Sequence, residues 1–444
     1  MRDVDVEFAV RGGTRIAYEV FGSGPIDLVV MNGGRFPIDL MWDLPQLAAF
    51  MDALGEVARV ITFDRTGSGA SDPMPTTDGA AGMENQVADV LAVLDAAASE
   101  RPSFFDFASG SSMVFLGATY PERVRSIIAT HLRTSFPEMR GFTFEQRKKM
   151  AQALASSRGL RSDNPRVSHD PELQRWWGRA RRLVSNTDAT ARQMEYAAQI
   201  DVESLLEHVR APTLVLHRSG NRLWDVETSR AVAARIPNSR FVELPGGEND
   251  IFLGDTEPVL AAVTQFLGQQ DTTVPDDDRA LATVLFTDIV ASTEQLAAHG
   301  DSAWRHVLDD HETAVARIVS DHRGHLVKTT GDGVLATFDG PARAVRCAAA
   351  LLEVATEQGI KLRAGLHTGE IEVRPSDLAG IAVHIANRIS ALAAANEILV
   401  SRTLVDLTAG SGLEFEPRGE HELKGVPGTW AIFRANMPAA TSAT

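Results

Sequence analysis

The chain has 444 residues and a formal net charge of −16, because 59 acidic side chains outnumber 43 lysines and arginines. This length corresponds to two to four domains, and the acidic excess argues against nucleic-acid binding, since no basic surplus exists to meet phosphates. The single cysteine, Cys347, excludes a disulfide framework within the chain. No apolar run reaches the roughly 18 residues of a membrane span, and the acidic N-terminus lacks a signal peptide's apolar stretch. We therefore expect a soluble cytoplasmic protein.

Apolar strands alternate with helical segments between about residues 5 and 268. Residues 26–31, 60–63 and 212–216 are continuous apolar runs, which predict buried strands of a mostly parallel sheet. Residues 137–208 are polar and helical without strand signals, so we predict an inserted helical cap. Its arginines either bind an acidic ligand or form a solvated helix face: Arg175, Arg179, Arg181 and Arg182.

Three segments of this region resemble the α/β-hydrolase fold. They are residues 63–72 (FDRTGSGASD), residues 120–124 (YPERV) and residues 211–217 (APTLVLH). The resemblance implies an α/β domain over residues 1–268 with a helical cap, and a fold alone says nothing about catalysis.

The catalytic positions of that family are altered here. A hydrolase needs a nucleophile on a G-x-S-x-G turn, an acid and a histidine, and no such turn lies in residues 104–111. The family's spacing from Pro121 puts Phe107 at the nucleophile position, and Ser109 reaches it only with a two-residue shift. The acid and histidine positions correspond to Asn221 and Asn249, and an amide is no general base near neutral pH.

The resemblance therefore implies a pseudo-hydrolase without catalysis. Its function would be either a pocket for a small-molecule ligand or a scaffold that orders a dimer. His131 and His217 would be either rescuing bases or structural histidines. Residues 269–279 are polar, acidic and without periodicity, which predicts a linker to a second domain over residues 280–434 and a tail over residues 435–444.

Two aspartates in the second domain predict a metal-bound nucleotide site. Asp288 ends the apolar segment 283–290, and Asp332 lies in the Gly-Asp-Gly turn of a predicted hairpin, where glycines tolerate the positive φ of a tight turn. Converging carboxylates bind hard cations such as Mg²⁺, and two such ions can clamp a phosphoryl transfer.

Four segments in order resemble the catalytic domain of the class III adenylate cyclases. They are residues 286–290, 328–332, 365–370 and 377–388. In the last segment His384 and Arg388 are four residues apart, so they share one helix face. The resemblance covers about residues 280–434 and implies an α+β, ferredoxin-like domain. It also implies conversion of ATP to 3′,5′-cyclic AMP and pyrophosphate with two Mg²⁺ or Mn²⁺ ions per site, held by Asp288 and Asp332.

The resemblance assigns roles to further residues. Lys328 and Asp377 match the pair that reads adenine, and Arg388 matches the cation that neutralises charge on the α-phosphate. The triphosphate would meet backbone N–H groups where a strand turns into a helix. Those positions are Ile289, Val290, Ser292 and Thr293.

Three positions leave alternatives open. The family usually has Asn where His384 stands, to orient the ribose, and often Gly where Ala291 stands. Lys424 either reaches the triphosphate or is an exposed structural lysine. No Gly-Lys-Ser/Thr loop is present, which argues against a P-loop ATPase.

In this family two domains face each other, one supplying the metal aspartates and the other supplying the purine pair and the arginine. One complete set in one chain implies a homodimer with two sites. The alternatives are a weakly active or inactive nucleotide-binding sensor, and an esterase with a regulatory cyclase domain.

Overall fold

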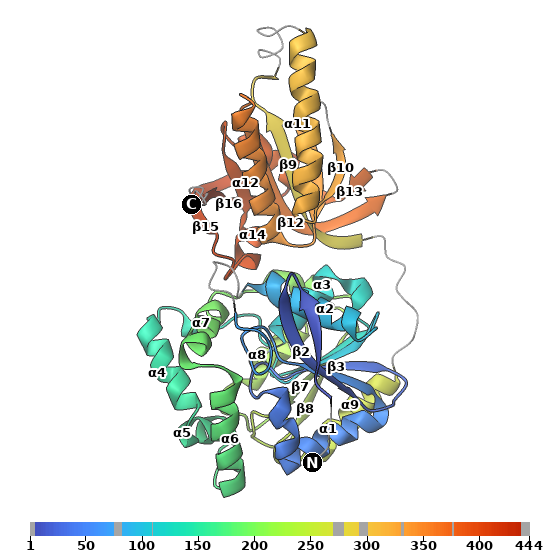
Figure 1. Ribbon diagram of the computed structural model, residues 1–444, viewed down its shortest axis with the longest axis vertical. Coiled ribbons are helices and arrows are strands. Elements are labelled where there is room, and N and C mark those ends of the chain that lie inside the picture. Colours follow the sequence, from blue (N-terminus) through green and yellow to red (C-terminus); the bar gives the residue numbers. More distant parts are fainter. Residues whose placement is uncertain are drawn as a thin grey trace. The chain divides into compact units, whose positions relative to one another are not determined.

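The computed structural model describes residues 5–74, 82–108, 110–269, 279–292, 301–329, 333–374 and 377–436. The chain divides into two compact units, Met1–Val274 and Pro275–Thr444, and each is described by itself (Figure 1). Of the predicted linker and tail, residues 270–278 and 437–444 lie outside the described residues.

The N-terminal unit is built on an eight-stranded sheet in the order β1-β2-β4-β3-β5-β6-β7-β8. The pairs β1–β2 and β2–β4 are antiparallel, whereas β3–β4 and the remaining pairs of this sheet are parallel. The strands are β1 (Glu7–Arg11), β2 (Thr14–Phe21), β3 (Asp27–Met31), β4 (Arg59–Phe63), β5 (Ser103–Asp106), β6 (Ser126–Thr130), β7 (Thr213–Arg218) and β8 (Ser239–Leu244). Strands β3 to β7 are almost wholly buried, as expected for apolar parallel strands with both faces covered.

Helices α1 (Pro45–Val57) and α9 (Glu257–Gly268) share one core with alternate strand residues such as Leu28, Val30 and Phe105. The remaining helices outside the cap are α2 (Met83–Ala96), α3 (Ser111–Thr119) and α8 (Val226–Ala233). Short 3-10 turns are η1 (Ile38–Asp43), η2 (Pro121–Arg123), η3 (Pro137–Met139) and η4 (Glu203–His208).

A helical cap connects β6 to β7. It contains α4 (Phe144–Leu154), α5 (Ser157–Asp163), α6 (Pro171–Val184) and α7 (Thr187–Ala197). Helix α6 begins at Pro171 behind the N-cap residue Asp170, whose carboxylate accepts hydrogen bonds from the next free N–H groups. Trp176 of α6 joins the α1/α9 core and donates its indole N–H to the carbonyl of Leu40 at 2.9 Å, so the cap is fastened to the sheet layer.

The C-terminal unit is built on a mixed sheet in the order β10-β11-β9-β12-β14-β16-β15, with β13 paired to β12. The strands are β9 (Arg279–Ile289), β10 (His325–Thr329), β11 (Gly333–Phe338), β12 (Leu362–Arg374), β13 (Asp377–Ala379), β14 (Ile398–Ser401), β15 (Glu414–Glu422) and β16 (Thr429–Asn436). The described helices are α11 (Asp301–Asp321), α12 (Pro341–Glu357), α13 (Ile381–Leu392) and α14 (Arg402–Leu407).

The two faces of this sheet have separate cores. Leu285 and Ile289 of β9 pack with α11 and α12, whereas Val284 packs with Ala382 and Ala386 of α13, as the alternation of side chains along a strand requires. Cys347 of α12 is buried in the first core, and burial raises the pKa of its thiol to about 12. It is a core residue and not a nucleophile.

Gly365 of β12 sets how closely α13 approaches the sheet. A Cβ atom at this position would lie 2.0 Å from the backbone N of Ser390 and 2.7 Å from the carbonyl O of Ala386. Only glycine therefore allows α13 to lie in its position along β12, and α13 carries His384 and Arg388. In the described part of the chain, no helix combines the length and the low polarity needed to cross a bilayer.

His367 of β12 predicts how the C-terminal unit responds to acid. Burial lowers the pKa of His367 to about 3, while a histidine in the unfolded chain titrates near pH 6.5. The folded imidazole stays neutral where the unfolded one takes a proton, so its contribution is fully present above pH 6.5. The free energy of unfolding should fall as the pH drops from 6.5 towards 3, by up to about 1.4 kcal/mol per pH unit.

We expect His367→Gln, which keeps a hydrogen-bonding group beside Ser401, to make this pH dependence shallower by up to one proton. Urea unfolding of the full chain can be followed through Cys347, the single thiol, with 4,4′-dithiodipyridine between pH 7 and pH 4.5. Equal slopes for wild type and variant would contradict the prediction.

Candidate active site

Asp288 lies near the end of β9, between two neighbouring strands. It is paired in register with Gly333, the first residue of β11, on one side and with Arg363 of β12 on the other. Its side chain is 32% exposed, so the carboxylate is open to solvent at this end of the sheet. Asp332, which precedes Gly333 in the sequence, lies outside the described residues.

Arg363 is a site residue that the sequence did not single out. Its Nε donates to Oδ2 of Asp288 at 2.8 Å, and its Nη2 donates to the same oxygen. Its Nη1 donates to the carbonyl of Ala391 in α13 at 3.3 Å. One guanidinium therefore joins Asp288 to the end of α13. The only sequence signal was the cross-strand position of Arg363, which depends on the register between β9 and β12.

Helix α13 presents His384 and Arg388 on its exposed face. Arg388 donates from Nε to the backbone carbonyl of Lys424 at 3.1 Å, so these two residues lie together although 36 positions separate them. Lys424 itself is exposed and follows β15. Within the described residues, no hydrogen bond or ion pair joins the Asp288–Arg363 pair to the Arg388–Lys424 pair.

The remaining predicted residues lie at several places in the unit. Lys328 is exposed on β10, opposite Leu335 of β11 and beside a register shift. Asp377 begins β13, opposite Arg374, and its side chain is outside the description. Ile289 ends β9, and Val290 donates its N–H to the carbonyl of Lys361 at 2.8 Å.

The turn after β9 has a strained residue. Ala291 has a φ of 57°, a left-handed conformation that glycine adopts without cost and other residues rarely adopt. This explains physically why a glycine would suit the position. Ser292 is helical, while Thr293 lies outside the described residues.

Asp288 offers one oxygen ligand to a divalent cation. Its carboxylate is partly exposed, and oxygen is the ligand that Mg²⁺ and Mn²⁺ prefer. Among the residues that the structure describes, no group of three or more His, Cys, Asp or Glu side chains gathers as a metal site. The second predicted ligand, Asp332, is not among them.

In the N-terminal unit the structure brings two of the three altered hydrolase positions together. Asn221 donates from Nδ2 to Oδ1 of Asn249 at 3.2 Å and lies 3.1 Å from Nε2 of His131. His131 and His217 meet edge to face at 4.7 Å between ring centroids. Burial lowers the pKa of both histidines, and the hydroxyl of Ser229 lies 3.0 Å from Nδ1 of His217. Both imidazole side chains are buried within the fold.

The third position, Phe107, belongs to the core. Its ring packs against Phe50, Phe105 and Phe252, with ring centroids 4.9 to 6.0 Å apart. A nucleophile elbow is a strained turn, yet in the described part of the chain the non-glycine residues with positive φ are Ala98, His131, Ala291, Arg323 and Asn396. Phe107 is not one of them. Ser109 lies outside the described residues.

The carboxylate of Asp106 accepts backbone N–H groups just after Phe107. In this fold the residue after the nucleophile supplies one of the N–H groups that bind the oxyanion. With Phe107 at the predicted nucleophile position that residue would be Ala108, whose N–H donates to Oδ1 of Asp106 at 2.6 Å. The N–H of Gly110 donates to the other oxygen of Asp106 at 3.2 Å, so this N–H pair is satisfied within the chain.

Comparison with known proteins supports these two descriptions separately. Residues 276–435 match the adenylate and guanylate cyclase catalytic domain family. Putative adenylate cyclase 3 of Rhizobium meliloti (strain 1021) is 32% identical over 157 residues, which are 33% of this chain and 27% of that protein. Adenylate cyclase of Streptomyces coelicolor is 31% identical over 131 residues, which are 29% of this chain and 34% of that protein. The match spans about a third or less of these relatives.

The N-terminal unit matches solved structures at the level of fold. A hydrolase from Pseudomonas aeruginosa PA01 is 22% identical with a TM-score of 0.51, covering 60% of this chain and 100% of that chain. The enol-lactonase from Burkholderia xenovorans LB400 is 21% identical with a TM-score of 0.50, covering 59% and 100%. The predicted fold classes are confirmed. The chain joins an N-terminal region with the α/β-hydrolase fold to a C-terminal catalytic domain of the class III adenylate and guanylate cyclase family.

Proposed function

We propose that this protein is an adenylate cyclase that converts ATP to 3′,5′-cyclic AMP and pyrophosphate at the interface of a homodimer. The observation that carries the proposal is the register of β9, which puts Asp288 directly opposite Gly333. Asp332 is bonded to Gly333, and consecutive Cα atoms are about 3.8 Å apart. This short chain distance supports the proposal that the two aspartates share one cation, although Asp332 itself lies outside the described residues.

Asp288 and Asp332 would hold two Mg²⁺ or Mn²⁺ ions, which when bound would acidify the ribose 3′-hydroxyl and stabilise the leaving pyrophosphate. Arg363 orients the Asp288 carboxylate through Oδ2 and compensates its charge.

The other residues would bind and orient the nucleotide. Lys328 donates to an adenine ring nitrogen, and Asp377 accepts from the exocyclic amino group. His384 would position the ribose in place of the family's asparagine, because imidazole also donates and accepts hydrogen bonds. Arg388, anchored at the carbonyl of Lys424, would meet the charge that develops on the α-phosphate.

Two features support a site shared between two chains. Within one chain Arg388 is held beside Lys424, whereas Asp288 is held on β9 beside Arg363. In addition, α13 exposes Ile381 (54%) and Leu392 (43%), and Phe286 on the same face of the sheet is only partly buried. A two-fold partner covering this face would bury these apolar side chains and bring the two half-sites together.

The alternative function is a nucleotide-binding sensor with weak or no turnover, and its support is His384 at the ribose position. The deciding experiment is incubation of the pure protein with ATP or GTP and either Mg²⁺ or Mn²⁺, with the product identified by chromatography. Cyclic AMP formation supports the cyclase. Nucleotide binding without a cyclic product supports the sensor.

Base choice should follow Lys328. We expect Lys328→Glu to lower kcat/KM for ATP by more than tenfold, because a donor to adenine becomes an acceptor; tenfold corresponds to about 1.4 kcal/mol. Arg305→Glu, the same charge reversal on the exposed face of α11, is the matched control and should leave turnover unchanged. Undiminished ATP turnover by Lys328→Glu would place the purine elsewhere.

Complementation tests the shared site. Asp288→Asn keeps an acceptor for Arg363 but weakens the metal site, and Arg388→Ala removes the cation that meets the α-phosphate, so each homodimer should be nearly inactive. In a mixed dimer both defects fall in one site and the other site is intact. With random exchange about half the dimers are mixed, so roughly a quarter of wild-type activity should return.

The control for complementation replaces one partner with the double variant carrying both changes, which leaves no intact site and should give no recovery. Absence of recovery from the two single variants, with subunit exchange shown by differently tagged chains, would mean that each site forms within one chain.

The N-terminal unit should not hydrolyse esters. Asn249 cannot accept a proton as a general base, and Asp106 already accepts the N–H of Ala108. We expect p-nitrophenyl ester cleavage equal to the buffer blank for wild type and for Ser109→Ala. Cleavage above the blank that disappears in Ser109→Ala or His131→Ala would favour the esterase instead.

A further inference from the structure

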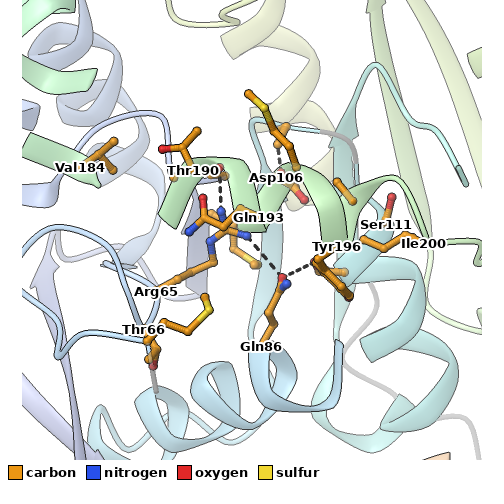
Figure 2. A pocket seen from close by; sticks show the side chains of 18 of the residues that line it. Arg65, Thr66, Gln86, Asp106, Ser111, Val184, Thr190, Gln193, Tyr196 and Ile200 are labelled. Atoms are coloured by element: carbon orange, nitrogen blue, oxygen red, sulfur yellow. Dashed lines mark hydrogen bonds between the residues drawn. The ribbon is translucent and has the colours of Figure 1, made fainter. Parts of the chain in front are cut away.

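The N-terminal unit contains a cavity of about 250 Å³ that the proposed cyclase reaction does not use. Figure 2 shows Arg65, Gln86, Asp106, Gln193 and Tyr196 around this cavity; Gln86 belongs to α2, and Gln193 and Tyr196 belong to α7. It lies where the substrate of a hydrolase would enter, yet the residues that would attack a substrate are absent. The side chains that line the cavity indicate which kind of ligand it could bind.

Arg65, which follows β4, is the main polar group of the wall. It donates from Nη2 to the carbonyl of Gly33 at 2.9 Å and from Nη1 to Oε1 of Gln86 at 3.3 Å. Its Nε is shut off from water and has no acceptor among the described residues. The same residues offer it no ion pair. Both partners are neutral oxygens, so its positive charge lacks a counterion in contact.

The two carboxylates in the cavity wall attract Arg65 through space, but they accept their hydrogen bonds from other groups. Asp89 accepts Nε of Arg11 at 2.7 Å, and Asp106 accepts the N–H groups of Ala108 and Gly110. Burying a charged group without a charged partner is costly. An anion bound beside Arg65 would recover part of that cost.

Two cap residues, Arg181 and Tyr196, would also interact with a bound anion. Arg181 is the one arginine of its cluster on α6 that lines the cavity, whereas Arg175, Arg179 and Arg182 are exposed. Its neighbours Asp163 and Asp250 are paired with Arg35, at 3.6 and 2.8 Å. Tyr196 is buried, and its hydroxyl has no hydrogen-bond partner in the described structure. Burial raises the pKa of Tyr196 and nearby Arg65 opposes that rise, so the phenol is a neutral donor close to the guanidinium.

The large apolar side chains of the wall are Met31, Met74, Phe136, Val184, Met194 and Ile200, and uncharged polar side chains such as Gln86, Ser112 and Gln193 line the remainder. Since a water molecule occupies about 30 Å³ of the liquid, the cavity has space for roughly ten non-hydrogen atoms. The wall contains two arginines, Arg65 and Arg181, and two aspartates, Asp89 and Asp106, so no surplus of positive charge is present to hold a doubly charged phosphate.

We propose that this cavity is a binding site for a small monocarboxylate with an aliphatic body of about eight carbons. The carboxylate is held by Arg65 with the Tyr196 hydroxyl, Arg181 contributes the second positive charge, and the methionine-rich wall encloses the chain. A planar guanidinium matches a carboxylate in geometry as well as in charge. Methionine side chains adapt to an irregular apolar ligand.

Calorimetric titration of the full chain tests this site with octanoate as the probe and octanamide as its uncharged analogue. Octanoate should bind at least tenfold more tightly than octanamide and should raise the melting temperature of the N-terminal unit. Octyl phosphate, which carries a second charge, should bind more weakly than octanoate. No octanoate binding, or equal binding of the acid and the amide, would overturn the proposal.

Substitutions of the cavity arginines test where octanoate binds. Arg65→Gln and Arg181→Gln should each weaken octanoate binding at least tenfold and leave octanamide unaffected, while Arg179→Gln, an exposed position on the same helix that pairs with Asp43, should bind like wild type. Circular dichroism and the cyclase assay report whether each variant is folded. If Arg65→Gln is unfolded, Arg181→Gln decides, and wild-type affinity in a folded Arg181→Gln overturns the assignment.

Discussion

The register of β9 between β11 and β12 is the constraint on which the cyclase site depends. It sets Asp288 opposite Gly333 on one side and opposite Arg363 on the other. A shift of one residue would turn Asp288 to the opposite face of the sheet, since side chains alternate along a strand. The apolar residues fix this register, because Leu285 and Ile289 belong to the α11/α12 core while Val284 belongs to the α13 core. Packing of the sheet thus also places Asp288, the proposed metal ligand.

Much of the architecture was readable from the sequence because its signals are local. Continuous apolar runs gave the parallel strands of the N-terminal unit, and the four-residue spacing of His384 and Arg388 gave their common helix face. Arg363 and the anchoring of Arg388 at Lys424 were missed, because both depend on which strands and loops become neighbours. The same is true of the cavity: four cap arginines look alike in sequence, and only folding decides that Arg181 lines it.

The two units illustrate different relations between fold and chemistry. Gly365 keeps α13 close to β12, so the backbone of the C-terminal unit positions the helix that carries the proposed site residues His384 and Arg388. In the hydrolase-like unit the backbone also persists, and Asn221 still meets Asn249 where an acid and a histidine would meet. Near the predicted nucleophile turn, Asp106 accepts the N–H of Ala108. A fold can retain the shape of a site without its chemistry, and we propose that this unit does.

The Asn221–Asn249 pair has a consequence for how the N-terminal cavity could be occupied. An enzyme consumes what enters its pocket, so occupancy depends on turnover as well as on supply. If the N-terminal unit does not catalyse, as the amides at Asn221 and Asn249 and the core position of Phe107 indicate, its cavity returns each ligand unchanged. Its occupancy then depends only on concentration and affinity. On this proposal the cavity would report the concentration of its ligand reversibly and would not consume it.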